Sequence, residues 1–397
     1  MLLDVALAVA AGGDCLADAG LLRDEPGVYG KVASDPTVSR LFALLGKDPG
    51  KAERLVDKAR ATARARVWSL AGQHAAMSIT DPLVIDVDAT LVTVHADKQG
   101  ARPTFKKGYG HHPLCAFADH GQPGTGEPLE MLLRAGNAGS NTAADHISVT
   151  RAALAQLPVA ASKKILVRAD GAGGTQEYVA WLAGKGVQYC VGFKLPDDTA
   201  SIYHQIPGSA WEPALDAGDE PRDGAWVSEW TGMLDLAGWA DGMRVIVRRE
   251  RPHPGAQLRF DDVDGYRLTA FVTNTRQGQL QTLELARRRR ARCEDRIRVG
   301  KHAGLNEFPL QGFDQNRIWC LIIQLAGELL AWAQMLALAG HEARRREPKR
   351  LRLRLLNCPA EIIRSDRRRV LRFKQTHPWA WLLAEALARR HKMPTPR

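Results

Sequence analysis

Acidic side chains in two predicted strands are the residues of this chain best placed for chemistry. Asp86 and Asp88 are two residues apart inside the apolar run 82–95, so both leave the same face of one strand. Asp170 ends a second apolar run, 164–170, directly before a glycine-rich turn. A buried carboxylate is costly unless another charge compensates it, and a metal ion is a common partner. The pattern therefore predicts an oxygen-lined metal site at a sheet edge.

A further charged group lies on one predicted helix. Arg290, Glu294 and Lys301 are spaced by four and seven residues, which places them on one helical face. Two simpler interpretations exist: Asp170 could only start a turn, and the helix charges could be a solvent-exposed ion-pair ladder. Five of the seven residues before Cys293 are arginines, and so many like charges repel unless an anion lies across them.

The order and spacing of these motifs resemble the DDE transposases of bacterial insertion sequences. The spacing Arg290-x3-Glu294-x6-Lys301 is similar to their Tyr-x2-Arg-x3-Glu-x6-Lys signature, with Arg287 at the position of the tyrosine. The contact that the tyrosine makes with a DNA phosphate is then either replaced by Arg287 or lost, and we expect Arg287 to bind DNA.

Two strand motifs extend the resemblance over roughly residues 80–340. Residues 85–90, Ile-Asp-Val-Asp-Ala-Thr, resemble the first catalytic block of that family, and residues 167–171, Val-Arg-Ala-Asp-Gly, resemble the second. Residues 136–142 are similar to the stretch between the blocks. We prefer Asp88 to Asp86 as the first ligand because a small residue and a threonine follow it directly.

The resemblance implies a site and a reaction. Asp88, Asp170 and Glu294 would be both the catalytic residues and the ligands of Mg²⁺, with Mn²⁺ as the alternative ion. Arg287, Arg290 and Lys301 would bind DNA. The activity implied is cut-and-paste DNA transposition by two-metal phosphoryl transfer, and the partners implied are the terminal inverted repeats, target DNA and a second subunit in a homodimer. The alternatives are a ribonuclease-H-like nuclease without strand transfer and an inactive DNA-binding relic.

Basic residues are concentrated in the last third of the chain. Residues 281–397 hold 26 of the 55 lysines and arginines but only 11 of the 44 acidic residues. This asymmetry predicts an anionic partner, and Arg344, Arg345 and Arg346 are expected to contact DNA phosphates. The simpler alternative is a solvated, arginine-rich surface.

Composition excludes several other classes of protein. With 36 glycines and 21 prolines among 397 residues, the chain is neither fibrous nor of low complexity. Its six cysteines form no Cys-x-x-Cys pair, and no secretory signal follows Met1, so we expect a cytoplasmic, nucleoid-associated protein. The apolar run 319–340 contains Gln324, Glu328 and Gln334, which favours a buried helix over a membrane span.

The element pattern predicts an α/β fold with a ribonuclease-H-like mixed sheet. We expect a helical region at 1–78 that begins abruptly, as in a shortened N-terminus, and that either binds DNA as a helix-turn-helix would or consists of short helices that only pack together. A catalytic domain at 79–340 would carry a β-rich insertion at about 195–280, and a basic tail would follow at 341–397. His111-His112, the glycine turn at 171–174 and the insertion tryptophans are read as structural rather than as metal, phosphate or base sites.

Overall fold

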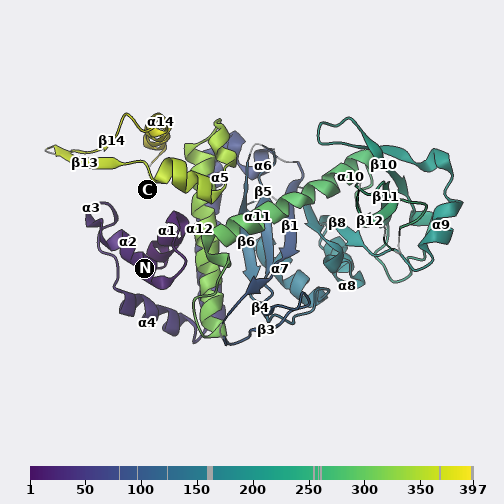
Figure 1. Cartoon of the computed structure of the whole chain (residues 1–397), viewed down its shortest axis with the longest axis horizontal. Coiled ribbons are helices and arrows are strands. Elements are labelled where there is room, and N and C mark those ends of the chain that lie inside the picture. The colour runs from purple at the N-terminus through teal and green to yellow at the C-terminus, as the bar shows by residue number, and fades with distance from the viewer. Residues whose placement is uncertain are drawn as a thin grey trace.

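A nine-stranded mixed sheet runs through the centre of the molecule, with helices on both faces and beyond one edge (Figure 1). The computed structural model describes residues 1–394 apart from 80, 96, 123, 159–163, 254, 258, 260–261 and 366–367. Within these residues the predicted α/β class is confirmed.

Five strands form the core of the sheet in the order β6-β5-β1-β7-β8. β1 is antiparallel to β5 and parallel to β7, which in turn is parallel to β8. This order and these directions are those of a ribonuclease-H-like sheet. The strands are β1 (Leu83–Ala89), β5 (Leu114–Asp119), β6 (Gly126–Leu132), β7 (Ile165–Ala169) and β8 (Gln188–Phe193), and a small sheet of β2 (Val92–Thr93), β3 (Arg102–Pro103) and β4 (Tyr109–His111) follows β1.

The predicted β-rich insertion extends the same sheet instead of forming a separate one. β12 pairs antiparallel with β8, and β11, β10 and β9 continue outward to the edge. The tryptophans of this region pack into the core: Trp230 is fully buried and Trp211 is nearly so. The elements are α9 (Thr199–Gln205), η4 (Gly208–Ala210), β9 (Glu212–Leu215), β10 (Pro221–Glu229), η5 (Thr231–Met233), β11 (Arg244–Glu250) and β12 (Arg267–Thr273).

Different helices cover the two faces of the core. Leu83, Ile85 and Val87 of β1 point into a cluster with α7 (Ala143–Ala155) and α8 (Gln176–Gly184). The opposite face contacts α11 and α12. One helical stretch joins the insertion to this face, since α10 packs on β9 and β10 while α11 packs on β1, β5 and β6. Its parts are α10 (Leu280–Arg288), η6 (Arg289–Ala291), α11 (Arg292–Gly300) and η7 (Lys301–Leu305).

The N-terminal helices share a core with α12 (Phe313–Ala337). By length and composition α12 could cross a membrane, but most of its apolar stretch is buried against α1, α5 and β6, as a core helix would be. The N-terminal elements are α1 (Leu2–Ala11), η1 (Leu16–Ala19), α2 (Gly20–Arg23), α3 (Pro26–Tyr29), α4 (Asp35–Leu45), α5 (Pro49–Ala71), η2 (Gly72–His74) and α6 (Ala76–Ile79).

Buried charges fasten α5 to α12 and to the sheet. Arg60 and Arg64 are almost fully buried, and both form ion pairs with Glu328 of α12. Arg64 also lies 3.5 Å from Glu127 of β6, and the indole of Trp68 donates to the same carboxylate at 2.6 Å. These buried ion pairs make α5 an integral layer of the molecule.

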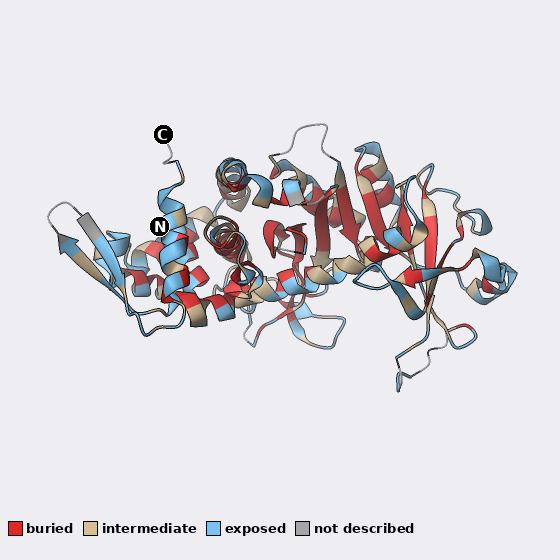
Figure 2. Ribbon diagram, turned by 90° about the horizontal axis from the view of Figure 1, so that it is seen from above, coloured by how far each residue is buried: buried red, intermediate tan, exposed pale blue. Residues whose placement is uncertain are grey.

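The C-terminal segment packs across the end of α12 and then projects from the body. Figure 2 shows buried residues gathered in the sheet and its covering helices, while the terminal hairpin and helix are largely exposed. The elements are η8 (Glu342–Arg345), α13 (Pro348–Leu351), η9 (Arg352–Leu356), β13 (Ala360–Ser365), β14 (Arg368–Phe373) and α14 (Ala380–His391).

Candidate active site

Two aspartates meet at the carboxyl ends of neighbouring parallel strands. β1 and β7 pair with Val87 opposite Ala169, so the next residues, Asp88 and Asp170, emerge side by side. Their side chains are 14% and 39% exposed, which leaves both open to solvent on one side. Asp170 also accepts the backbone N–H two residues on at 3.0 Å and so caps η3 (Gly171–Gly173). The glycine run after it is therefore a turn, as predicted.

One guanidinium bridges these two carboxylates. Nη1 of Arg290 lies 3.0 Å from Oδ2 of Asp88, and Nη2 lies 4.0 Å from Oδ2 of Asp170. Arg290 belongs to η6, which holds it over the end of β1. The structure thus brings three of the predicted site residues together, with a cation from the protein between two acids.

Glu294 lies one helical turn beyond Arg290, in α11. Its side chain is exposed, and its charge contributes to the raised pKa of Asp88. The ligand atoms of Asp88, Asp170 and Glu294 do not all come within 4.8 Å of one another. The arrangement is therefore an open set of acids around one edge of the sheet.

The carboxyl of Asp88 is hard to ionise. Burial raises the pKa of Asp88 to about 6; Arg290 opposes this rise, whereas the charges of Asp170 and Glu294 add to it. Three acids with one arginine in contact leave an excess of negative charge, which a divalent cation would neutralise.

Asp86 shares a strand face with Asp88 but lies in different surroundings. Its side chain is 1% exposed, and Arg168 of β7 donates to its two oxygens at 2.7 and 2.8 Å. Arg168 also donates to Asp119 of β5 at 3.1 Å. Burial by itself would lower the pKa of the Arg168 guanidinium, but Asp86 and then Asp119 raise it. A carboxylate held in this way has no free oxygen for a metal, which supports the preference for Asp88.

Asp119 joins this buried group to α11. Arg292 donates to it at 3.0 Å and Arg296 at 3.2 Å, in addition to Arg168. Burial opposes ionisation, but Arg296, Arg168 and Arg292 lower the pKa of Asp119. The sequence analysis missed this network. A charged residue inside an apolar strand was the signal that drew attention to Asp86, and Arg168 in the run 164–170 is a second example of it.

The structure does not bring the other predicted DNA-binding residues to the acids, and they differ in burial. Arg287 borders a cavity of about 610 Å³ beside Gly171, and Lys301 borders another of about 580 Å³ next to β2. Arg344 is buried, with its guanidinium donating to the carbonyl of His74 at 2.6 Å. The guanidinium of Arg346 stacks on Trp379 at 4.5 Å, and of the three consecutive arginines only Arg345 is exposed.

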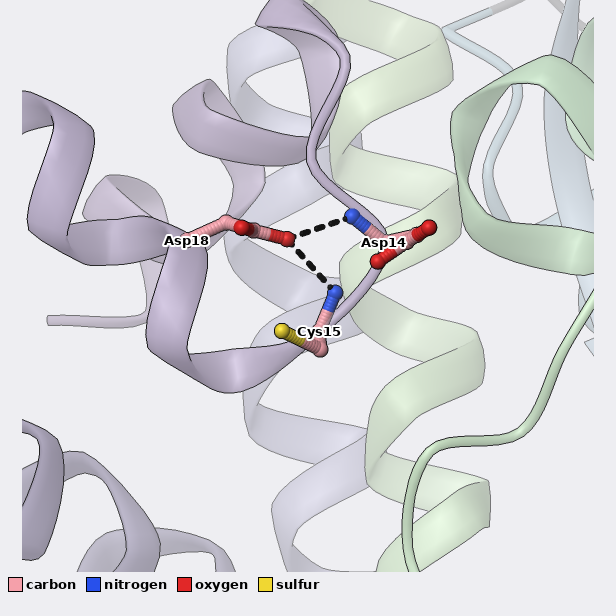
Figure 3. A group of neighbouring side chains, drawn as sticks. All are labelled: Asp14, Cys15 and Asp18. Carbon is pink, nitrogen blue, oxygen red and sulfur yellow. Dashed lines mark hydrogen bonds between the residues drawn. The ribbon is translucent and has the colours of Figure 1, made fainter.

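Two groups of residues whose side-chain types can bind metals are instead hydrogen-bonded within the protein. His111 and His112 each contact a backbone carbonyl, at 3.2 and 3.3 Å. Among the described residues, one set of three acidic, cysteine or histidine ligand atoms lies within 4.8 Å: Asp14, Cys15 and Asp18. Figure 3 shows that Asp18 accepts the backbone N–H groups of the other two, at 2.7 and 2.9 Å, so its carboxylate already caps a turn.

The strand order and the acids at its edge define a ribonuclease-H-like protein. The family model described as transposase DDE domain group 1 matches residues 1–395, and the chain belongs to this family. The resemblance to DDE transposases seen in the motifs is thereby confirmed at the level of the family.

Among solved structures, the chain is similar to a piggyBac transposase in a cryo-EM synaptic complex with hairpin DNA. The identity is 9% and the TM-score 0.39; the match covers 80% of this chain and 56% of that one, so the chain spans little more than half of that protein's length. No curated protein matches the chain.

Proposed function

We propose that this protein is a transposase that cleaves the ends of an insertion sequence and joins them to target DNA. The observation that supports this most directly is the pair Asp88 and Asp170 at the carboxyl ends of adjacent parallel strands, with Glu294 on the helix that crosses them. Membership of the DDE family agrees with this assignment.

The acids suit Mg²⁺ or Mn²⁺ as the cofactor. All three offer carboxylate oxygens, the ligands that these hard cations prefer, and they carry more negative charge than Arg290 neutralises. When bound, such ions activate a water or 3′-hydroxyl and stabilise the leaving oxygen. Asp88 and Asp170 would hold the ions from the rigid sheet, while Glu294 would complete the set from the helix.

Arg290 would have two partners in turn. Without DNA its guanidinium bridges Asp88 and Asp170. A DNA phosphate is an equally good partner for a guanidinium, so the incoming strand would draw Arg290 away from the acids. Arg287 and Lys301, on either side along the same helical stretch, would hold the strand by further phosphate contacts. We place the element ends and the target DNA at this edge, with the two ends held by a homodimer.

The test uses the gene with its native flanking DNA on a plasmid and purified protein. We expect Mg²⁺-dependent cleavage at the element ends, followed by joining of 3′-hydroxyl ends to a second plasmid. Asp88→Asn should abolish both steps and preserve DNA binding without divalent ions. Cleavage without joining would identify a nuclease instead, and binding without either reaction would identify an inactive relic.

A further inference from the structure

A cavity rich in arginine lies on the other side of the helical stretch from the acids. It has a volume of about 490 Å³ and is bordered by the turn between β5 and β6 and by η8. None of Asp88, Asp170, Arg290 or Glu294 lines it. Its six arginines come from four elements, and only Asp295 and Glu347 among its lining residues are acidic: Arg288, Arg289, Arg292, Arg296, Arg298 and Arg345.

The helix itself separates this cavity from the candidate active site. Arg288, Arg292 and Arg296 are spaced by four residues and form one stripe along the cavity side. Residues two apart on a helix point about 200° from each other, so Arg292 faces away from Arg290. The two sides of one helical stretch therefore carry two separate groups of arginines.

Several of these guanidinium groups retain capacity for an anion. Arg345 is exposed and has no ion pair within the described part of the chain. Arg289 lies 3.7 Å from Asp219, which is 69% exposed, too far for a hydrogen bond. Arg292 donates to Asp119 through Nη1 alone, which leaves its other donors for the cavity. Three other arginines of the cavity already have acidic partners: Arg288 pairs with Glu284 at 3.1 Å, Arg296 with Asp119 at 3.2 Å, and Arg298 with Asp295 and Glu347 at 2.5 and 3.0 Å.

The cavity continues into a second one of about 600 Å³. Gln122 and Arg345 line both, and the second extends along His74, His341 and Glu342. An elongated track suits a polymer better than a free phosphate or nucleotide.

We propose that this track binds a second stretch of nucleic-acid backbone, distinct from the strand at the acids. Guanidinium forks spaced along a groove match successive phosphodiester groups. The proposal rests on the proposed function for its ligand class, but its site shares no residue with the acids. The bound backbone belongs either to target DNA or to the element end beyond the cleavage point.

The test compares two double variants that lose the same charge. The cavity variant, Arg289→Ala with Arg345→Ala, removes the two cavity arginines with the weakest ion pairing. The control variant, Arg151→Ala with Arg222→Ala, removes two surface arginines that border none of the cavities described above. Binding of a labelled 30-base-pair duplex is measured by fluorescence anisotropy without divalent ions. We expect the cavity variant to bind about tenfold more weakly and to lose about 1.8 units of log–log salt slope, the value for two phosphate contacts.

Two outcomes would overturn the proposal, and two others would identify the DNA that is bound. An unchanged slope in the cavity variant, or an equal loss in both variants, overturns the proposal. Because binding is measured without metal, the result stands even if the wild type cleaves no DNA. Element-end and unrelated duplexes, assayed separately, show the source: a loss confined to element ends places that DNA in the track, and an equal loss for both duplexes places target DNA there.

Discussion

Asp86 and Asp88 lie two residues apart on one strand face, yet their surroundings are opposite. Asp86 belongs to a closed group in which two acids, Asp86 and Asp119, meet three arginines. Asp88 belongs to an open group in which acids outnumber the one arginine in contact, Arg290. The closed group satisfies its charges within the protein, whereas the open group leaves a deficit of positive charge. That deficit, more than the residue type, separates a structural carboxylate from a candidate ligand.

The largest expected effect concerns activity in the open group. Asp88→Asn should reduce DNA cleavage roughly 10³-fold or more, because a neutral amide loses several kcal/mol of charge stabilisation with the ion. Rates are measured on element-end DNA in Mg²⁺ under single-turnover conditions. Wild-type cleavage by this variant would remove Asp88 from the site.

The next effect concerns stability in the closed group. Asp119→Asn should lower the free energy of unfolding by about 3–5 kcal/mol, since three arginines lose their shared buried partner. Urea unfolding at pH 7.5 measures this, with Asp219→Asn at the exposed surface as the control. If the two variants unfolded alike, the closed group would contribute nothing to stability and the contrast would fail.

A smaller effect of opposite sign is expected at Asp88. Since its pKa is about 6 in the folded protein against an ordinary 3.8, ionisation costs the folded state up to about 3 kcal/mol above pH 6. Asp88→Asn should therefore stabilise the protein by about 1–3 kcal/mol at pH 8. The cost disappears as pH falls through 6 towards 4, so about half of the gain should remain at pH 5. Thermal unfolding at both pH values checks the sign; destabilisation at pH 8 would contradict it.

The smallest effect concerns the bridging arginine. Arg290→Ala should strengthen Mn²⁺ binding about five- to tenfold in the absence of DNA, because the ion no longer competes with the guanidinium, roughly 1–1.4 kcal/mol. Arg287→Ala is the matched control, since Arg287 interacts electrostatically with Asp170 but forms no ion pair within the described residues. Titration followed by electron paramagnetic resonance gives both affinities. An equal gain in Mn²⁺ affinity in both variants would mean that the overall positive charge near the acids, and not the bridging contact of Arg290, limits metal binding.

Much of the sheet could be predicted from the sequence because its core strands are short, continuous apolar runs. The apolar runs at 82–95 and 164–170 contain β1 and β7, and the β-rich insertion expected at about 195–280 contains β9 to β12. Within the insertion, β9 and β10 are weakly marked in the sequence because their residues alternate with exposed, polar positions at the sheet edge. β13 and β14 were missed for a related reason, since the hairpin is flanked by charged residues and packs on little else.

The candidate site was only partly accessible to sequence reasoning. Helical spacing placed Arg290, Glu294 and Lys301 on one face, and the resemblance to the DDE family grouped them with Asp88 and Asp170. The closed group around Asp119 depends on contacts between β1, β5, β7 and α11, and such tertiary contacts leave no periodic trace. The burial of Arg344 likewise follows from packing against His74, 270 residues away along the chain. In a run of arginines, the sequence cannot distinguish a buried member from an exposed one.

The buried ion pairs between α5 and α12 also constrain the order in which the chain folds during synthesis. Arg64 can pair with Glu328 only after Glu328 has been synthesised, 264 residues later. At roughly 5–20 residues per second, that interval lasts about 13–53 s. Until then the two guanidinium groups of α5 lack their shared acidic partner, so α5 cannot complete its core before α12 has been made. An early helix of the sequence, α5, therefore becomes native only after α12, and the layer that the two helices share forms late in synthesis.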